Sequence, residues 1–107
     1  MHISANAALT RLKESGQLFL NLFEHSSLQV EMYKPDIVDL QQPQEQDEVY
    51  VILSGSGEFI NGETQMEFQP GDFLFVPAGV EHRFINFTTD FAAWVIFYGP
   101  KGGEKIL

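Results

Sequence analysis

The amino-acid sequence predicts an all-β fold, an antiparallel barrel or double-sheet sandwich that follows one short helix. About eight short segments, rich in β-branched and aromatic residues, succeed one another at intervals of roughly ten residues, which is typical of such folds. Turn signals separate the segments, and no helical pattern lies between any two of them, which excludes a parallel βαβ architecture. A closed or double-sheet arrangement protects the edges of many short strands and is therefore expected.

The predicted elements follow in order along the chain. A short helix covers Ala5–Glu14, with Asn6 or Ser4 as its amino-terminal cap and Gly16 at its end. The predicted strands are Leu18–Glu24, Ser27–Tyr33, Glu48–Leu53, Glu58–Ile60, Thr64–Phe68, Asp72–Val76, His82–Phe87 and Phe91–Tyr98. The pattern thus divides the chain into a helical segment (1–17), a β-barrel (18–98) and a carboxy-terminal tail (99–107).

Composition excludes several classes of function. The 107 residues suffice for one domain, and six Lys and Arg stand against fifteen Asp and Glu, a formal charge of -9. A surface of that sign repels phosphate backbones, so nucleic acids and anionic membranes are not expected partners. The chain has no cysteine, which excludes disulfides and thiolate chemistry. No segment is long and apolar enough to span a membrane, and a soluble cytoplasmic protein is expected.

Residues 71–86 resemble the second conserved motif of the cupin superfamily. That motif runs Gly, five residues, Pro-x-Gly, two residues, His, three residues, Asn. All five fixed positions are matched, by Gly71, Pro77, Gly79, His82 and Asn86. The resemblance extends over roughly residues 34–98 and implies the double-stranded β-helix, or jelly-roll barrel, of that family.

The first cupin motif is matched only in part. It runs Gly, five residues, His-x-His, three or four residues, Glu, six residues, Gly, and Glu48 and Gly55 have the required separation. With three intervening residues, Gln42 and Gln44 stand where the family has its two histidines. The four-residue spacing would place Pro43 at a ligand position, and we reject it because proline has no side-chain donor.

The resemblance implies a position for a metal site. In cupins, the two His and the Glu of the first motif and the His of the second commonly bind one divalent metal ion inside the barrel. The corresponding set here is Gln42, Gln44, Glu48 and His82, of which Glu48 and His82 are also the candidate catalytic residues. A glutamine amide replaces imidazole poorly as a ligand of transition metals, so we expect reduced metal affinity.

Strand periodicity adds two expectations. Residues two apart share one face of a strand, so positions 42, 44, 46 and 48 would lie together if the extended backbone continued that far. By the same rule Tyr50 and Phe84 would share the faces of Glu48 and His82, and we expect them to line the cavity.

Ordinary structural roles are open for the same residues. Glu48 can pair with a neighbour at the mouth of the barrel, and His82 can be a hydrogen-bonded structural histidine. Gln42 and Gln44 lie in a polar, glutamine-rich segment, where solvated loop residues are common.

Three functions remain open at this point. The first is a cupin that binds a small molecule and has a weak or degenerate metal site, which the missing histidines favour. The second is a metal-dependent dioxygenase, isomerase or decarboxylase that uses Glu48 and His82, which can also perform acid–base chemistry without metal. The third is a structural or regulatory barrel that acts as a homodimer, since compact cupins often pair through their sheets.

Overall fold

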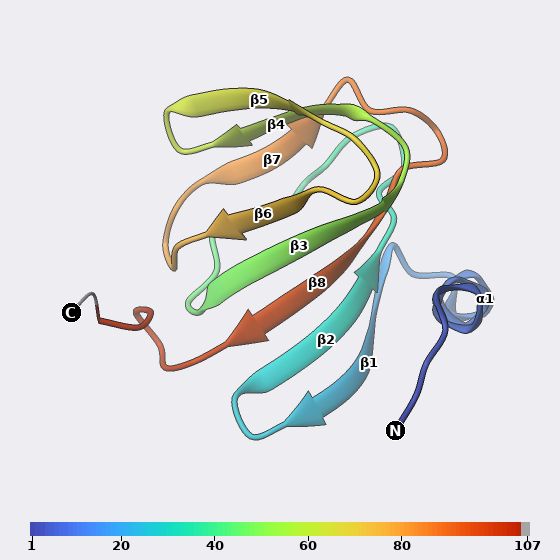
Figure 1. Ribbon diagram of the computed structural model, residues 1–107, viewed down its shortest axis with the longest axis horizontal. Helices are drawn as coiled ribbons and strands as arrows, with labels where there is room; N and C mark the ends of the chain where they lie inside the picture. Colours follow the sequence, from blue (N-terminus) through green and yellow to red (C-terminus); the bar gives the residue numbers. More distant parts are fainter. Residues whose placement is uncertain (106–107) are drawn as a thin grey trace.

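The computed structural model describes residues 1–105 and confirms the all-β prediction (Figure 1). One helix precedes eight strands, and their bounds are α1 Ala5–Ser15, β1 Phe19–His25, β2 Leu28–Tyr33, β3 Asp47–Ser54, β4 Gly57–Asn61, β5 Thr64–Phe68, β6 Phe73–Val76, β7 His82–Ile85 and β8 Ala92–Tyr98. Five strands form one sheet in the order β1-β2-β8-β3-β6, and three form a second in the order β5-β4-β7. All pairings within these sheets are antiparallel, as in a jelly-roll barrel.

The helix covers the outer face of the larger sheet. The Ser4 hydroxyl caps its start by accepting a hydrogen bond from the Ala7 N–H (3.1 Å), and Gly16 ends it in the left-handed conformation at φ 70°. Figure 1 shows α1 beside β1, outside the barrel. Ala8 and Leu12 pack there against Met32 and further apolar side chains of the outer face. Within residues 1–105, no helix has the length and hydropathy needed to cross a membrane.

The main core lies between the two sheets and is largely aromatic. It comprises mainly inward-facing side chains of the strands, including Tyr50, Phe59, Phe68, Phe84 and Phe91. Neighbouring rings in this group lie with centroids 4.5–5.8 Å apart in tilted or edge-on orientations, which suits their quadrupoles. The rings of Tyr50 and Phe59 also lie next to the ring of His82, at centroid distances of 5.9 and 6.2 Å, so the aromatic core adjoins the polar residues inside the barrel.

The predicted strand bounds agree with the structure to within one residue at each end, except at the end of β7. The strand predicted to reach Phe87 ends at Ile85, because Asn86 adopts a positive φ of 51° that breaks the extended conformation. The strand that carries Glu48 begins at Asp47, and residues 39–46 form a loop. The extended backbone therefore does not continue to residue 42, and the alternation that would align 42 and 44 with 48 does not apply.

Candidate polar site at the mouth of the barrel

Strand register places Glu48, Tyr50 and His82 inside the barrel. Glu48 and Tyr50 lie two residues apart on β3, so both side chains point to the inner face of the sheet. Glu48 pairs with Val76 of β6 and with Phe97 of β8. His82 begins β7 and comes from the opposite sheet. All three residues are buried, and Glu48 is 0% exposed. The two sheets thus bring a carboxylate, a phenol and an imidazole into one buried group.

His82 contacts the other two directly. Its Nε2 lies 3.0 Å from Glu48 Oε1 and 3.0 Å from the Tyr50 hydroxyl, while its Nδ1 lies 2.9 Å from the Val80 carbonyl oxygen. The contact with Glu48 is an ion-pair contact without the alignment of a hydrogen bond, and neither Glu48 oxygen has a hydrogen-bond partner. The charge on His82 is therefore the main compensation available to this buried carboxylate.

Asp39 fixes the orientation of the remaining polar groups. Its carboxylate accepts hydrogen bonds from the Tyr33 hydroxyl (2.5 Å), the Phe84 N–H (2.8 Å) and both the backbone N–H (3.1 Å) and the side-chain amide (3.0 Å) of Gln41. Because a carboxylate only accepts, the Gln41 nitrogen must face Asp39 and its oxygen must face Tyr50. The Tyr50 hydroxyl then donates its proton to Gln41 Oε1 at 2.7 Å.

This direction of donation determines the protonation of His82. The Tyr50 oxygen accepts from His82 Nε2, because its own proton is used toward Gln41. The carbonyl of Val80 also only accepts, so Nδ1 carries a proton as well. Burial lowers the pKa of His82, but the contacts with Glu48 and Val80 and the charge of Asp39 outweigh it and raise the pKa above 6.5. The partners of His82 therefore select the imidazolium form.

Tyr50 and Tyr33 are held in their protonated forms. Burial, followed by the nearby charge of Glu48, raises the pKa of Tyr50 well above its ordinary value of 10.0. Burial and the hydrogen bond to Asp39 raise the pKa of Tyr33 in the same direction. Both phenols can therefore act as hydrogen-bond donors over the whole physiological range of pH.

These donors do not fit a tightly held transition metal. An imidazolium has no free lone pair for a metal, and the Nε2 direction is already used by the Tyr50 hydroxyl. The Glu48 carboxylate is the one strong ligand in reach, and the remaining groups are a phenol and an amide, which are weak ligands in neutral form. Across residues 1–105, no three His, Cys, Asp or Glu side chains come together as metal ligands would.

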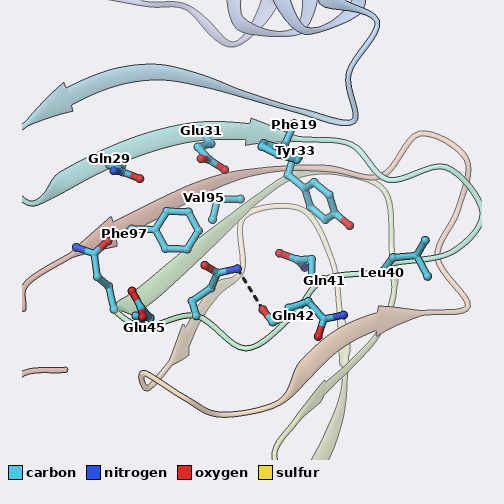
Figure 2. A pocket seen from close by; sticks show the side chains of 12 residues that line it. Phe19, Gln29, Glu31, Tyr33, Leu40, Gln41, Gln42, Glu45, Val95 and Phe97 are labelled. Atoms are coloured by element: carbon cyan, nitrogen blue, oxygen red, sulfur yellow. Dashed lines mark hydrogen bonds between the residues drawn. The ribbon is translucent and has the colours of Figure 1, made fainter. Parts of the chain in front are cut away.

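A cavity of about 440 Å³ opens directly beside this group (Figure 2). Tyr33 and Gln41 belong both to its wall and to the hydrogen-bonded chain. Figure 2 shows Gln29 and Glu31 extending from β2 toward the same space as Gln41. Five glutamines line the cavity, at positions 29, 41, 42, 44 and 46. The wall therefore offers many neutral donors and acceptors.

The residues proposed from sequence fall into three groups. Glu48, Tyr50 and His82 come together as described, with the ring of Tyr50 in the core and its hydroxyl against His82. Gln42 and Gln44 lie in the 39–46 loop and line the cavity; the Gln44 amide donates to the Gln42 carbonyl oxygen (3.1 Å) and not to Glu48. Phe84 packs in the aromatic core.

Sequence reasoning missed Asp39, Gln41, Tyr33 and Glu31. Asp39 and Gln41 lie in an irregular segment, where neither periodicity nor motif spacing indicates which side chains turn inward. Tyr33 carried a usable signal, because it ends a strand and a buried tyrosine hydroxyl normally requires a partner. Glu31 lies two residues before Tyr33 on the same face and could have been found with it.

Comparison with known proteins gives a consistent result. A family model described as a cupin domain matches residues 30–98. An uncharacterized protein of Streptomyces coelicolor is 32% identical over 85 residues, which cover 78% of this chain and 81% of that protein.

Solved structures agree at the level of the fold. A cupin superfamily protein of Desulfitobacterium hafniense superposes with a TM-score of 0.65 at 20% identity, over 78% of this chain and 77% of that one. A cupin-2 domain containing protein of Shewanella frigidimarina gives a TM-score of 0.63 at 18% identity, over 84% of this chain and 92% of that one.

Proposed function

This chain belongs to the family of cupin domains, and on that premise we propose that it is a small-molecule-binding cupin with at most a weak divalent-metal site. One observation carries the proposal. The cavity wall and the buried hydrogen-bonded chain share Tyr33 and Gln41, so a ligand in the cavity would meet side chains that are already held in place. Such preorganised polar groups in a concave site are typical of ligand recognition.

The histidine content of the chain argues against a tightly bound metal. In the motif-one alignment that we adopt, Gln42 and Gln44 replace the two histidines of the family. A spacing of four residues before Glu48 would instead place Pro43 and Gln41 at the two histidine positions. Of these two residues, Gln41 accepts a hydrogen bond from the Tyr50 hydroxyl. Neither spacing provides an imidazole, because the chain has only three histidines, at positions 2, 25 and 82. Redox chemistry at a metal, which depends on a defined set of ligands, is therefore disfavoured.

Two further proposals concern the setting of this function. Phe73 and Phe75 are exposed on the edge strand β6, and exposed aromatic side chains of this kind support a homodimer in which a second copy covers them. The absence of cysteine suits a reducing compartment, and we place the protein in the cytoplasm.

Metal analysis and ligand mapping together test the proposal. Protein purified without nickel resin or chelator is analysed for metals, and we expect no stoichiometric transition metal. A stoichiometric metal that is lost in the His82→Ala variant would overturn the proposal.

The cavity is tested as the ligand site by comparing small-molecule binding before and after a tryptophan side chain is placed in it. Amide spectra recorded with a library of small polar molecules should shift around Tyr33, Gln41 and Val95. The Gln29→Trp variant narrows the cavity and should abolish those shifts, whereas Gln65→Trp, the same change on the exposed strand β5, should retain them. Equal binding by both variants would place the ligand elsewhere and refute the cavity as its site.

A further inference from the structure

The cavity has an unusual charge balance. Its charged wall residues are both acidic, Glu31 and Glu45, and none of the six Lys and Arg residues of the chain lines it. Three aromatic residues complete the wall, Phe19, Tyr33 and Phe97. Carboxylates combined with aromatic faces are the groups by which proteins recognise organic cations.

Glu31 is the carboxylate that a ligand would meet. It lies on β2 between Asn21 of β1 and Val95 of β8, on the face that turns toward the cavity. Among residues 1–105, no Lys, Arg or His side chain forms a salt bridge with it. Burial, and then the charge of Glu48, raise the pKa of Glu31, in keeping with the absence of a salt bridge to its half-buried carboxylate.

Glu45 differs from Glu31 in each of these respects. Its carboxylate is largely exposed and lies 3.7 Å from Lys101 Nζ. Water and a neighbouring cation therefore already compensate its charge. Asp39 and Glu48, the other acidic groups nearby, are compensated by four hydrogen bonds and by His82 respectively. Among the described residues, Glu31 is the one carboxylate of this group with neither a side-chain hydrogen bond nor a cation in contact with it.

Part of the rim of the cavity is apolar, alongside the exposed Gln42 and Glu45. Phe19 is 55% exposed and Leu40 is 78% exposed, and both line the cavity. Figure 2 shows Leu40 at one side of the opening, with Phe19 and Tyr33 above the cavity. A ligand with a polar head at Glu31 and an apolar group at the mouth would cover both kinds of surface.

Resting on the function proposed above, we propose that the cavity binds a small organic cation, an amine that carries an apolar or aromatic group, with its ammonium at Glu31. The ammonium would donate to the Glu31 carboxylate and to the oxygen of a neighbouring glutamine amide such as Gln29. The apolar group would lie against Phe19 and Leu40. A neutral ligand of the same shape leaves Glu31 uncompensated, and an anionic ligand adds repulsion to it.

Three probes of one shape and different charge test this proposal. Benzylamine, benzyl alcohol and benzoate share a ring and differ in the charge of the polar group at pH 7. Each is titrated into the full-length protein, and dissociation constants and binding positions are taken from amide chemical shifts. We expect benzylamine to bind about tenfold more tightly than benzyl alcohol, because charge-assisted hydrogen bonds are about twice as strong as neutral ones. We expect no shifts with benzoate.

Two matched variants locate the effect. Glu31→Gln should bind benzylamine and benzyl alcohol equally, and it should fold at least as well as the parent, because it removes a poorly compensated charge. Glu67→Gln makes the same change in charge on β5, outside the cavity, and should keep the tenfold preference. A preference that persists in Glu31→Gln, or that is lost in Glu67→Gln, overturns the assignment to Glu31.

The outcomes separate this proposal from the function on which it rests. Benzyl alcohol or benzoate binding in the cavity as tightly as benzylamine refutes the cation and leaves the small-molecule site intact. Absence of binding by all three probes refutes the cation proposal, while the broader library tests the site. Benzylamine shifts that lie away from Tyr33, Gln41 and Val95 refute the cavity as the place where the amine binds.

Discussion

Removal of the Glu48 side-chain charge is expected to destabilise the protein strongly. The Glu48→Leu variant leaves the buried imidazolium of His82 without its carboxylate, 3.0 Å away in the parent. At an effective dielectric constant of about 20, that separation corresponds to an attraction of about 5 kcal/mol. Desolvation of the two ions opposes it, so the pair itself has little net value, but loss of one partner costs roughly 3–5 kcal/mol.

The double variant makes the reasoning quantitative. Glu48→Leu combined with His82→Leu removes both charges and restores apolar packing, so it should cost no more than about 2 kcal/mol relative to the parent. Urea unfolding of the parent, both single variants and the double variant gives the coupling free energy. A Glu48→Leu cost below about 1 kcal/mol, or a double variant as costly as the sum of the single ones, would refute the buried ion pair.

The coupling free energy between Glu48 and His82 depends on pH, because it requires the protonated form of His82. Because its pKa in the folded protein is raised above 6.5, the value in the unfolded chain, the protonated imidazole stabilises the fold fully below pH 6.5. This contribution is lost as the pH rises through the folded pKa. The coupling should therefore be largest near pH 6 and smaller in alkaline buffer.

Further predictions concern the elements around the site. Asp39→Asn should lower the free energy of unfolding in urea by about 3 kcal/mol, because the new NH₂ group would face at least one of the groups that now donate a hydrogen bond to the carboxylate. An unchanged urea midpoint would contradict the structural role of these hydrogen bonds. Gly55→Ala should lower the free energy of unfolding by at least about 2 kcal/mol, since Gly55 has φ +80° and an added Cβ would lie 2.5 Å from the Phe91 Cα. An unchanged free energy of unfolding would show that the backbone at Phe91 can move away from the new methyl group without cost. Glu31→Gln should raise the thermal midpoint at pH 7 but not well below pH 4.5, because a raised carboxyl pKa means that ionisation costs stability; a lower midpoint at pH 7 would reverse the sign of our argument. Phe73→Asp should convert a homodimer to a monomer in light-scattering measurements, and a parent that is already monomeric would contradict the dimer.

The fold was accessible from sequence because its signals are local. The Asn61-Gly62 turn and the strand Thr64–Phe68 appear where the sequence places them, and Gly16 ends the helix. Turn chemistry of this kind acts within a few residues and survives in the folded chain. The end of β7 at Ile85 was missed because Asn86, which the strand pattern includes, has a φ of 51°, and strand periodicity does not reveal a left-handed residue.

The site was only partly accessible. Motif spacing and strand alternation indicated Glu48, Tyr50 and His82, and the structure brings these three together. Gln41 and Asp39 lie in a loop whose path is determined by tertiary contacts, such as the hydrogen bond from the Phe84 N–H to Asp39. No periodicity applies to such a segment, so sequence spacing could not show that Gln41 would reach Tyr50.

The most direct test of the account is the protonation of His82, on which the preference for ligand binding over metal binding depends. Nitrogen NMR of the imidazole, in protein purified without nickel resin and assigned with His82→Ala, follows both ring nitrogens through a pH titration. We predict that Nδ1 and Nε2 both carry protons in the imidazolium form, and that the midpoint lies above 6.5. A midpoint below 6.5 with Nε2 unprotonated at neutral pH would leave a nitrogen free for a metal and contradict the account.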